Sequence, residues 1–267
     1  LGVDSTYYNK PTSDMLQSIG VAPSLGFIGS RLTNLGEVSN KGVELALFGR
    51  PVQTRNFDWD SRLTYAANKN ELVSFGVEGK VSENPLGQAY GVVQQHRPGY
   101  PLGGYWILPA RRDPNGVPLV TPTGVAIFAA GDTARQYVGP STPTREVGFS
   151  NTLTLFRNFR VYALLDYKGG HYLYNFQERN RCQINDNCAR NMDPRARAPQ
   201  TASDSVLAKE LAVWRNAGID YVWIQKADFT KLREVSLTYD VPGTFTRFIG
   251  GRGASITLSG RNLAIWT

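Results

Sequence analysis

The sequence predicts an all-β fold that forms part of a transmembrane antiparallel β-barrel, with about seven strands, short periplasmic turns and long extracellular loops. Three observations predict it: apolar and polar residues alternate, the alternating segments run to about ten residues or more, and short connections alternate with long ones. Successive strand side chains point to opposite faces, so each segment has one apolar and one polar face. Globular strands average about five or six residues, whereas membrane-spanning strands need about nine to eleven.

Seven strands are expected in chain order, and five of them carry the alternation most clearly. The expected strands cover residues 1–8, 41–51, 57–69, 144–156, 159–169, 227–241 and 252–262. In the last five strands, the apolar positions are Trp59, Leu63, Tyr65 and Ala67; Val147, Phe149, Leu153 and Leu155; Phe159, Val161, Ala163, Leu165 and Tyr167; Val235, Leu237, Tyr239 and Val241; and Ala254, Ile256 and Leu258. Tyr162 and Leu164 are exceptions, because they fall among polar positions of the fifth strand.

The connections fall into two classes. The turns near 51–57 and 156–159 are short and are expected on the periplasmic side, which leaves 9–40, 70–143 and 170–226 as long loops outside. Short turns on one side and long loops on the other are typical of membrane barrels. A helix is expected over 203–218, where Ser203 or Asp204 can cap and Gly218 can end it. A soluble sandwich would also alternate, with its apolar face inward, and the pattern leaves that alternative open.

Four segments resemble one protein family. The segments are Asn34–Leu47, Tyr137–Pro143, Phe229–Pro242 (FTKLREVSLTYDVP) and Gly260–Thr267 (GRNLAIWT). In order and spacing they resemble motifs of the SusC/RagA-type TonB-linked outer-membrane transporters, and the resemblance covers essentially the whole chain. Within Phe229–Pro242, the polar Lys231, Arg233 and Glu234 are expected to face the barrel lumen and pair with neighbouring strands.

The resemblance implies a location and a function. It implies that residues 1–267 are the C-terminal portion of a TonB-dependent receptor barrel, without the plug domain and TonB box with which the family begins. The expected function is import of oligosaccharides or peptides through the outer membrane. Expected partners are a SusD-type surface lipoprotein, TonB through the missing N-terminal region, the glycan or peptide substrate and outer-membrane lipid. A soluble or surface-exposed β-rich binding module without transport activity is the alternative.

Substrate or partner contacts are expected in the outer loops, because recognition commonly lies in loops. The candidates are aromatic residues that could stack on sugar rings or fill an interface: Tyr105, Trp106, Tyr172, Trp214 and Trp223. Packing of the long loops on themselves is the alternative for the same residues. Cys182 and Cys188, six residues apart, suit a small disulfide in an oxidising compartment. Two free thiols or a metal-binding pair remain possible from spacing alone.

Other functions find little support in the sequence. His96 and His171 lie on different loops without a nucleophile or metalloprotease motif, so no enzyme, catalytic residue, metal or cofactor is expected. Asp113–Gly116 and Asp186–Asn187 offer oxygen atoms to Ca²⁺, but Asp-Pro-Asn-Gly is first of all a turn. The 29 Lys and Arg exceed the 22 Asp and Glu, giving a net charge of +7. These cations are scattered and lie mostly on outer loops, which favours contact with anionic lipid or a partner over nucleic acid.

Overall fold

A computed structural model gives the fold of most of the chain. It describes residues 1–21, 29–34, 36–78, 80–81, 93–185, 187–189, 206–215, 223–248 and 250–267. These residues form two compact units. The sheet unit comprises Leu1–Glu71, Pro143–Gly170 and Ala227–Thr267, and the loop unit comprises Leu72–Thr142 and His171–Lys226. None of the helices in the described part of the chain is long and apolar enough to cross a membrane.

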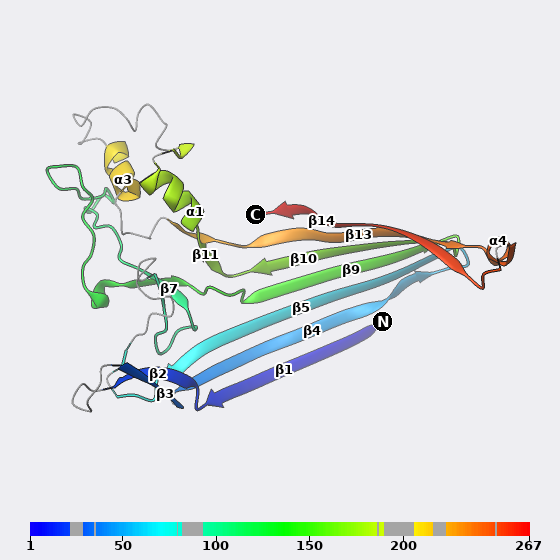
Figure 1. The fold of residues 1–267 in the computed structure, drawn as a ribbon, viewed down its shortest axis with the longest axis horizontal. Coiled ribbons are helices and arrows are strands. Elements are labelled where there is room, and N and C mark those ends of the chain that lie inside the picture. The colour runs from blue at the N-terminus through cyan, green and yellow to red at the C-terminus, as the bar shows by residue number, and fades with distance from the viewer. Residues whose placement is uncertain are drawn as a thin grey trace. The chain divides into compact units, whose positions relative to one another are not determined.

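The sheet unit is built on one seven-stranded sheet (Figure 1). Its order is β1-β4-β5-β9-β10-β13-β14, so each strand lies beside the next one along the chain. The bounds are β1 Gly2–Ser13, β4 Glu37–Gln53, β5 Phe57–Ser74, β9 Arg145–Leu155, β10 Phe159–Gly169, β13 Phe229–Val241 and β14 Ala254–Trp266. The all-β prediction is confirmed, and each expected strand corresponds to one of these seven. Within this sheet β1 and β14 each pair with one neighbour, so they are its two edges.

The strands β4 and β5 are longer than expected, at 17 and 18 residues. Most of their extra residues lie at the ends away from the short turns, where the hydrophobic alternation stops. There Asn70 Nδ2 donates to Asn40 Oδ1 at 2.9 Å, which continues the contact between the strands with polar side chains. Alternation of apolar and polar residues identifies only the part of a strand that has one face in an apolar environment. The pattern therefore could not predict this polar extension.

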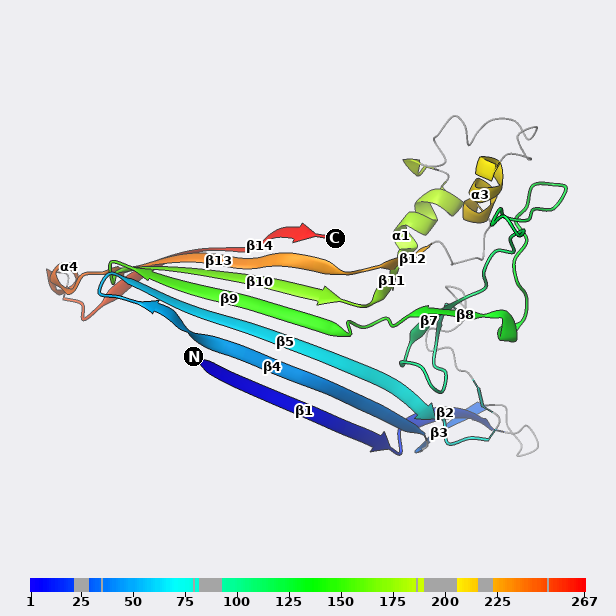
Figure 2. The same ribbon diagram turned by 180° about the vertical axis from the view of Figure 1, so that it is seen from behind.

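Short turns join strands at one end of the sheet (Figure 2). Phe156 and Arg157 connect β9 to β10 with positive φ angles of 50° and 66°. Asn158 N–H donates to the Leu155 carbonyl oxygen at 3.2 Å and closes that turn. Positive φ at both central residues matches the right-handed twist of a hairpin. The helix α4 (Gly243–Phe248), which the sequence did not predict, lies in the β13–β14 connection.

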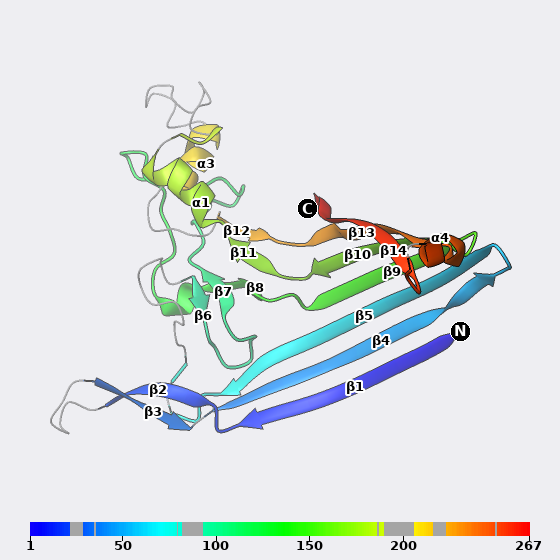
Figure 3. The ribbon, with the colours of Figure 1, turned by 45° about the vertical axis from the view of Figure 1, so that its right-hand side comes forward.

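A second hairpin follows β1 and precedes β4. The strands β2 (Leu16–Val21) and β3 (Gly29–Asn34) pair from Leu16 opposite Asn34 to Val21 opposite Gly29, as Figure 3 shows. The sequence pattern predicted a long outer loop over 9–40 and did not predict this hairpin. Each strand has six residues, too few for a two-residue period to stand out from a polar background.

The loop unit consists of small sheets and short helices. One sheet joins β6 (Gln94–Gln95), β7 (Gly104–Ile107) and β8 (Gln136–Gly139), and another joins β11 (Tyr172–Tyr174) to β12 (Ile224–Lys226). The helical segments are η2 (Asp132–Ala134), α1 (Phe176–Arg179), the π-helical turn η3 (Asn180–Ile184) and α3 (Val206–Arg215). The expected helix over 203–218 corresponds to α3, and residues 203–205 and 216–218 lie outside the described residues.

Candidate functional site

The two faces of the seven-stranded sheet differ in chemistry, and the printed registers define both. Apolar residues form successive rows across β5, β9, β10, β13 and β14. From the short-turn end, the first row is Phe57, Leu155, Phe159, Tyr239 and Ile256, and the second is Trp59, Leu153, Val161, Leu237 and Leu258. The third row, which is the least apolar, is Ser61, Asn151, Ala163, Val235 and Gly260. The fourth is Leu63, Phe149, Leu165, Leu232 and Ala264, and the fifth is Tyr65, Val147, Tyr167, Thr230 and Trp266. We call these five rows the apolar band.

The apolar band is exposed rather than packed into a core. Leu165, Leu237 and Leu258 have exposed fractions of 36%, 43% and 75%. In a soluble sandwich these side chains would be buried between two sheets. Large exposed apolar surfaces of this kind mark contact with lipid or protein.

The height of the apolar band suits a membrane. Aromatic residues occupy its two outermost rows, with Phe57 and Tyr65 eight positions apart along β5. At ~3.3 Å per residue this is about 26 Å along the strand, or about 20 Å at a tilt of ~40°. Membrane barrels carry an apolar belt about 25 Å tall between two girdles of aromatic residues. The third row contains one amide, Asn151, which accepts a hydrogen bond from Trp59 Nε1 at 2.9 Å.

The opposite face, which we call the polar face, is covered by ion pairs between neighbouring strands. Arg50 on β4 contacts Asp58 and Asp60 on β5, at 3.3 and 3.0 Å. The other pairs are Lys168–Glu146 at 2.9 Å, Arg160–Asp240 at 3.2 Å, Arg261–Glu234 at 3.5 Å and Arg233–Asp166. Charges on adjacent strands of one face therefore neutralise one another, as expected for the wall of a water-filled lumen.

A bulge at Arg233 places two consecutive charged residues on the polar face. Against β10 the register passes from Leu164 opposite Glu234 to Leu165 opposite Leu232, which leaves Arg233 as an extra residue. Because of this irregularity, Arg233 reaches Asp166 while Glu234 reaches Arg261. The expected pairing of Arg233 and Glu234 with neighbouring strands is confirmed. Strict alternation would have put them on opposite faces, so the bulge itself was not predictable from the period.

The polar face is hollowed in two places. One hollow has a volume of about 330 Å³ and the other about 370 Å³. Asp4, Glu44, Glu146 and Asp166 line the first, together with Arg62, whose guanidinium lies 5.5 Å from the centre of the Phe48 ring. The four carboxylates and the hydroxyl groups of Thr6 and Thr64 in this hollow can form hydrogen bonds to hydroxyl, amide and ammonium groups. Sequence reasoning did not single out these residues, because they come together only when five strands are in register.

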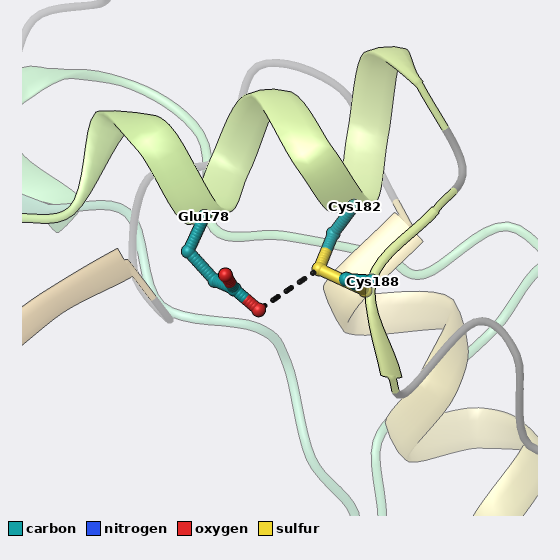
Figure 4. Close-up of side chains that lie close together, drawn as sticks. All are labelled: Glu178, Cys182 and Cys188. Atoms are coloured by element: carbon teal, nitrogen blue, oxygen red, sulfur yellow. Dashed lines mark hydrogen bonds between the residues drawn. A yellow bond between two sulfur atoms is a disulfide. The ribbon is translucent and has the colours of Figure 1, made fainter.

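The disulfide and two tryptophans of the loop unit, Trp214 and Trp223, form one small core. Cys182 and Cys188 are bonded, with their Cα atoms 4.9 Å apart. They pack with Trp223, which is completely buried, and the ring of Trp214 meets that of Trp223 edge to face at 5.2 Å. Glu178 Oε1 lies 3.6 Å from Cys182 Sγ, as Figure 4 shows. A bonded sulfur carries no proton, and bonded cysteines supply no thiolate to a metal.

The predicted contact aromatics pack largely within the loop unit. Tyr105 and Trp106 have exposed fractions of 6% and 5%. Tyr105 belongs to a core with Val93, Ile107 and Ile224, against which the half-buried Tyr172 also packs. Together with the burial of Trp223, this corresponds to the alternative in which the loops pack on themselves. A contact role for the five aromatics stays a prediction.

Two of the remaining polar candidates, His96 and Asp113, have structural partners. His96 Nδ1 accepts a hydrogen bond from the Gly103 N–H at 2.8 Å, whereas His171 is buried and its Nδ1 has no hydrogen-bond partner among the described residues. Asp113 Oδ1 accepts from the N–H groups of Asn115 and Val117, at 2.8 and 3.0 Å. The Asp-Pro-Asn-Gly segment is therefore a turn that the Asp113 carboxylate itself closes. Asp186 lies outside the described residues.

An aromatic cluster in the loop unit perturbs one tyrosine. The rings of Tyr100, Trp106 and Tyr137 lie 4.6 to 5.4 Å apart, and the Arg97 guanidinium lies 4.3 Å from the Trp106 ring centre. Burial, with smaller contributions from Tyr100 and Tyr172, raises the pKa of Tyr137 to about 12. The neutral phenol is thus favoured in the folded state.

This shift predicts alkaline weakening of the loop unit. The pKa of Tyr137 is higher when folded than when unfolded, so its contribution to stability is complete below about pH 10. It is lost as the pH rises from about 10 to 12. We expect the near-ultraviolet circular dichroism of the wild type to weaken over that range, and less so for Tyr137→Phe. The control Tyr7→Phe removes an exposed phenol and should behave like the wild type; equal titration of all three proteins would contradict the assignment.

The chain is similar to several TonB-dependent receptors. No protein-family model matches the chain. TonB-dependent receptor P26 of Formosa agariphila is 26% identical over 98% of this chain and 28% of its own length. TonB-dependent receptor SusC of Bacteroides thetaiotaomicron is 27% identical over 44% of this chain and 12% of its own length. The chain spans about a quarter of the length of the first curated relatives it matches.

Solved structures share the fold. The RagAB peptide transporter structure matches with a TM-score of 0.74 and 19% identity, over 99% of this chain and 29% of that one. The RagAB peptide importer in the closed-closed state matches with a TM-score of 0.71 and 20% identity, over 99% of this chain and 30% of that one. These relatives are receptors and transporters, not enzymes. The chain is therefore similar to a segment of TonB-dependent receptors, SusC among them, and it has the fold of the matching segment of the RagAB structures.

Proposed function

We propose that the protein containing this chain imports a nutrient across the outer membrane, and that the chain supplies the C-terminal part of its barrel wall. The observation that carries the proposal is the division of one sheet into an exposed apolar band and a polar face lined with ion pairs. A wall with lipid on one side and water on the other encloses a path for a hydrophilic solute. No covalent chemistry is needed for this task.

The substrate class we propose is an oligosaccharide or a peptide. The hollows of the polar face offer carboxylates and hydroxyl groups, which suit polar, hydrogen-bonding solutes. The similar structures are titled as a peptide importer and a peptide transporter, and SusC is among the curated relatives. We further propose a SusD-type lipoprotein partner at the loop side and TonB coupling through an N-terminal plug region outside this chain.

Uptake by living cells tests the proposal. We expect a strain that lacks the complete gene to lose import of one labelled class, peptides or oligosaccharides, and to regain it with the wild-type gene. Import should also stop when TonB is absent, and a surface lipoprotein should co-purify with the receptor from detergent extracts. Unchanged uptake of both classes after deletion would contradict the proposal. Extraction of the complete protein without detergent would favour the alternative, a soluble binding module.

A further inference from the structure

Three cations stand just beyond one edge of the apolar band, on the same face. Arg145 lies opposite Ala67 on β5 and opposite Gly169 on β10, which is the row directly after Tyr65, Val147 and Tyr167. Lys69 follows Ala67 by two positions on β5, so it shares that face. The Asn40–Asn70 hydrogen bond joins β4 and β5 on the polar face. Lys41 and Lys69, one position away on each strand, therefore lie side by side on the opposite face.

From these positions we infer that Lys41, Lys69 and Arg145 bind the phosphate groups of lipopolysaccharide in the outer leaflet. The inference gives the expected contact with outer-membrane lipid a defined site, and it rests on the proposed function and its orientation, with the long loops outside the cell. The site is continuous with the exposed apolar band, and its charge is opposite to that of lipid phosphates. Arginine and lysine are the side chains that bind phosphate best.

The depth of the three cations fits a headgroup. One row is two residues, or about 7 Å along a strand, so Arg145 lies that far beyond the aromatic row. Diagonal neighbours on a sheet are about 7–8 Å apart, so Arg145 and Lys69 can approach one anion together. The rows between Phe57 and Tyr65 contain no charged residue. The three cations therefore lie just beyond the part of the sheet that faces hydrocarbon, at the level expected for lipid headgroups.

The charge balance at the site stays positive. Lys69 Nζ contacts Glu71 Oε2 at 2.7 Å, while the Lys69 side chain remains 75% exposed. Glu37 is the next acidic residue on this face of β4, four positions from Lys41. Like charges on directly opposite residues destabilise a sheet. An anion between Lys41 and Lys69 would offset the repulsion between their ammonium groups. Three cations against Glu71 and the more distant Glu37 leave a net charge of about +1 on this face, which favours a phosphorylated lipid.

Binding of defined lipids to the complete receptor in detergent tests the inference. The probes are lipid A with both phosphates and the same lipid A after dephosphorylation, with affinity measured by native mass spectrometry. We expect the wild type to prefer the phosphorylated lipid at least tenfold. The triple variant Lys41→Gln, Lys69→Gln and Arg145→Gln should lose that preference, and the preference should weaken at high salt. Inorganic phosphate at equal concentration should not compete.

The matched control removes three cations from the short-turn end: Arg55→Gln, Arg247→Gln and Arg252→Gln. We expect it to keep the preference, as should Arg145→Lys, because both leave the charge of the site intact. Heat-modifiable mobility in gels confirms that each variant barrel is folded. Equal binding of the two lipids by the wild type, or an undiminished preference in the triple variant, overturns the inference. Either result leaves nutrient uptake, and with it the proposed function, unaffected.

Discussion

Leu153→Arg is expected to prevent stable assembly of the barrel in the outer membrane. Leu153 lies in the second row of the apolar band, between Trp59 on β5 and Val161 on β10. A guanidinium at this position would face hydrocarbon, at a cost of about 2–4 kcal/mol near the bilayer midplane. A typical domain is stable by only about 5–15 kcal/mol, so a loss of this size is large. Outer-membrane fractionation and heat-modifiable mobility on gels measure the folded fraction.

Thr152→Arg is the matched control, because it introduces the same side chain one residue away. Thr152 lies opposite Asp60 on β5 and Tyr162 on β10, and it lines the larger hollow of the polar face. An arginine there meets water and an acidic neighbour, so we expect near-normal assembly. Equal losses of folded barrel from the two substitutions would mean that the faces are wrongly assigned. A smaller loss from Leu153→Arg than from Thr152→Arg would mean that the apolar band does not contact lipid.

Trp223→Ala is expected to unfold the small core around the disulfide. Trp223 is completely buried and packs against Trp214 and the cysteine pair. Truncating a buried tryptophan costs about 3–5 kcal/mol, because contacts are lost and a cavity remains. Hydrogen exchange should show lost protection in α1, η3 and α3, while the strands of the sheet unit keep theirs.

Two control variants separate packing from other effects. Trp223→Phe retains most of the buried ring and removes an indole N–H that has no hydrogen-bond partner among the described residues, so we expect a smaller loss. Val206→Ala shortens a side chain that is 56% exposed in α3 and should change little. If Trp223→Ala leaves exchange rates unchanged, the disulfide alone stabilises this core and the packing argument fails.

The strands of the sheet were predictable because lipid and lumen impose a period of two on long segments. All seven were found, with bounds in error mainly where β1, β4 and β5 continue into polar sequence. The β2–β3 hairpin, the small loop sheets and α4 were missed. Their strands and helix are short, and short elements depend on tertiary contacts that leave no period in the sequence.

The chemistry of the site was less predictable than the fold. Alternation identified the apolar rows, and the mixture of charges around Arg233 indicated lumen pairs. The bulge at Arg233 and the hollow near Asp4 and Glu44 depend on register, which turns and bulges set and composition does not. Spacing alone could not distinguish the Cys182–Cys188 disulfide from free thiols. The candidate aromatics were chosen for their side-chain chemistry, whereas burial, which decides their accessibility, emerged only from the fold.

Within the described sheet β1 and β14 are the edge strands, and in a membrane both edges need partner strands from the rest of the protein. Each edge carries main-chain amide and carbonyl groups that form no hydrogen bonds within this sheet. Exposing one such group to hydrocarbon costs several kilocalories per mole. A sheet with exposed edges would therefore stay in water or pair with strands of another chain. Both edges must therefore be joined to neighbouring strands before or while the sheet enters hydrocarbon.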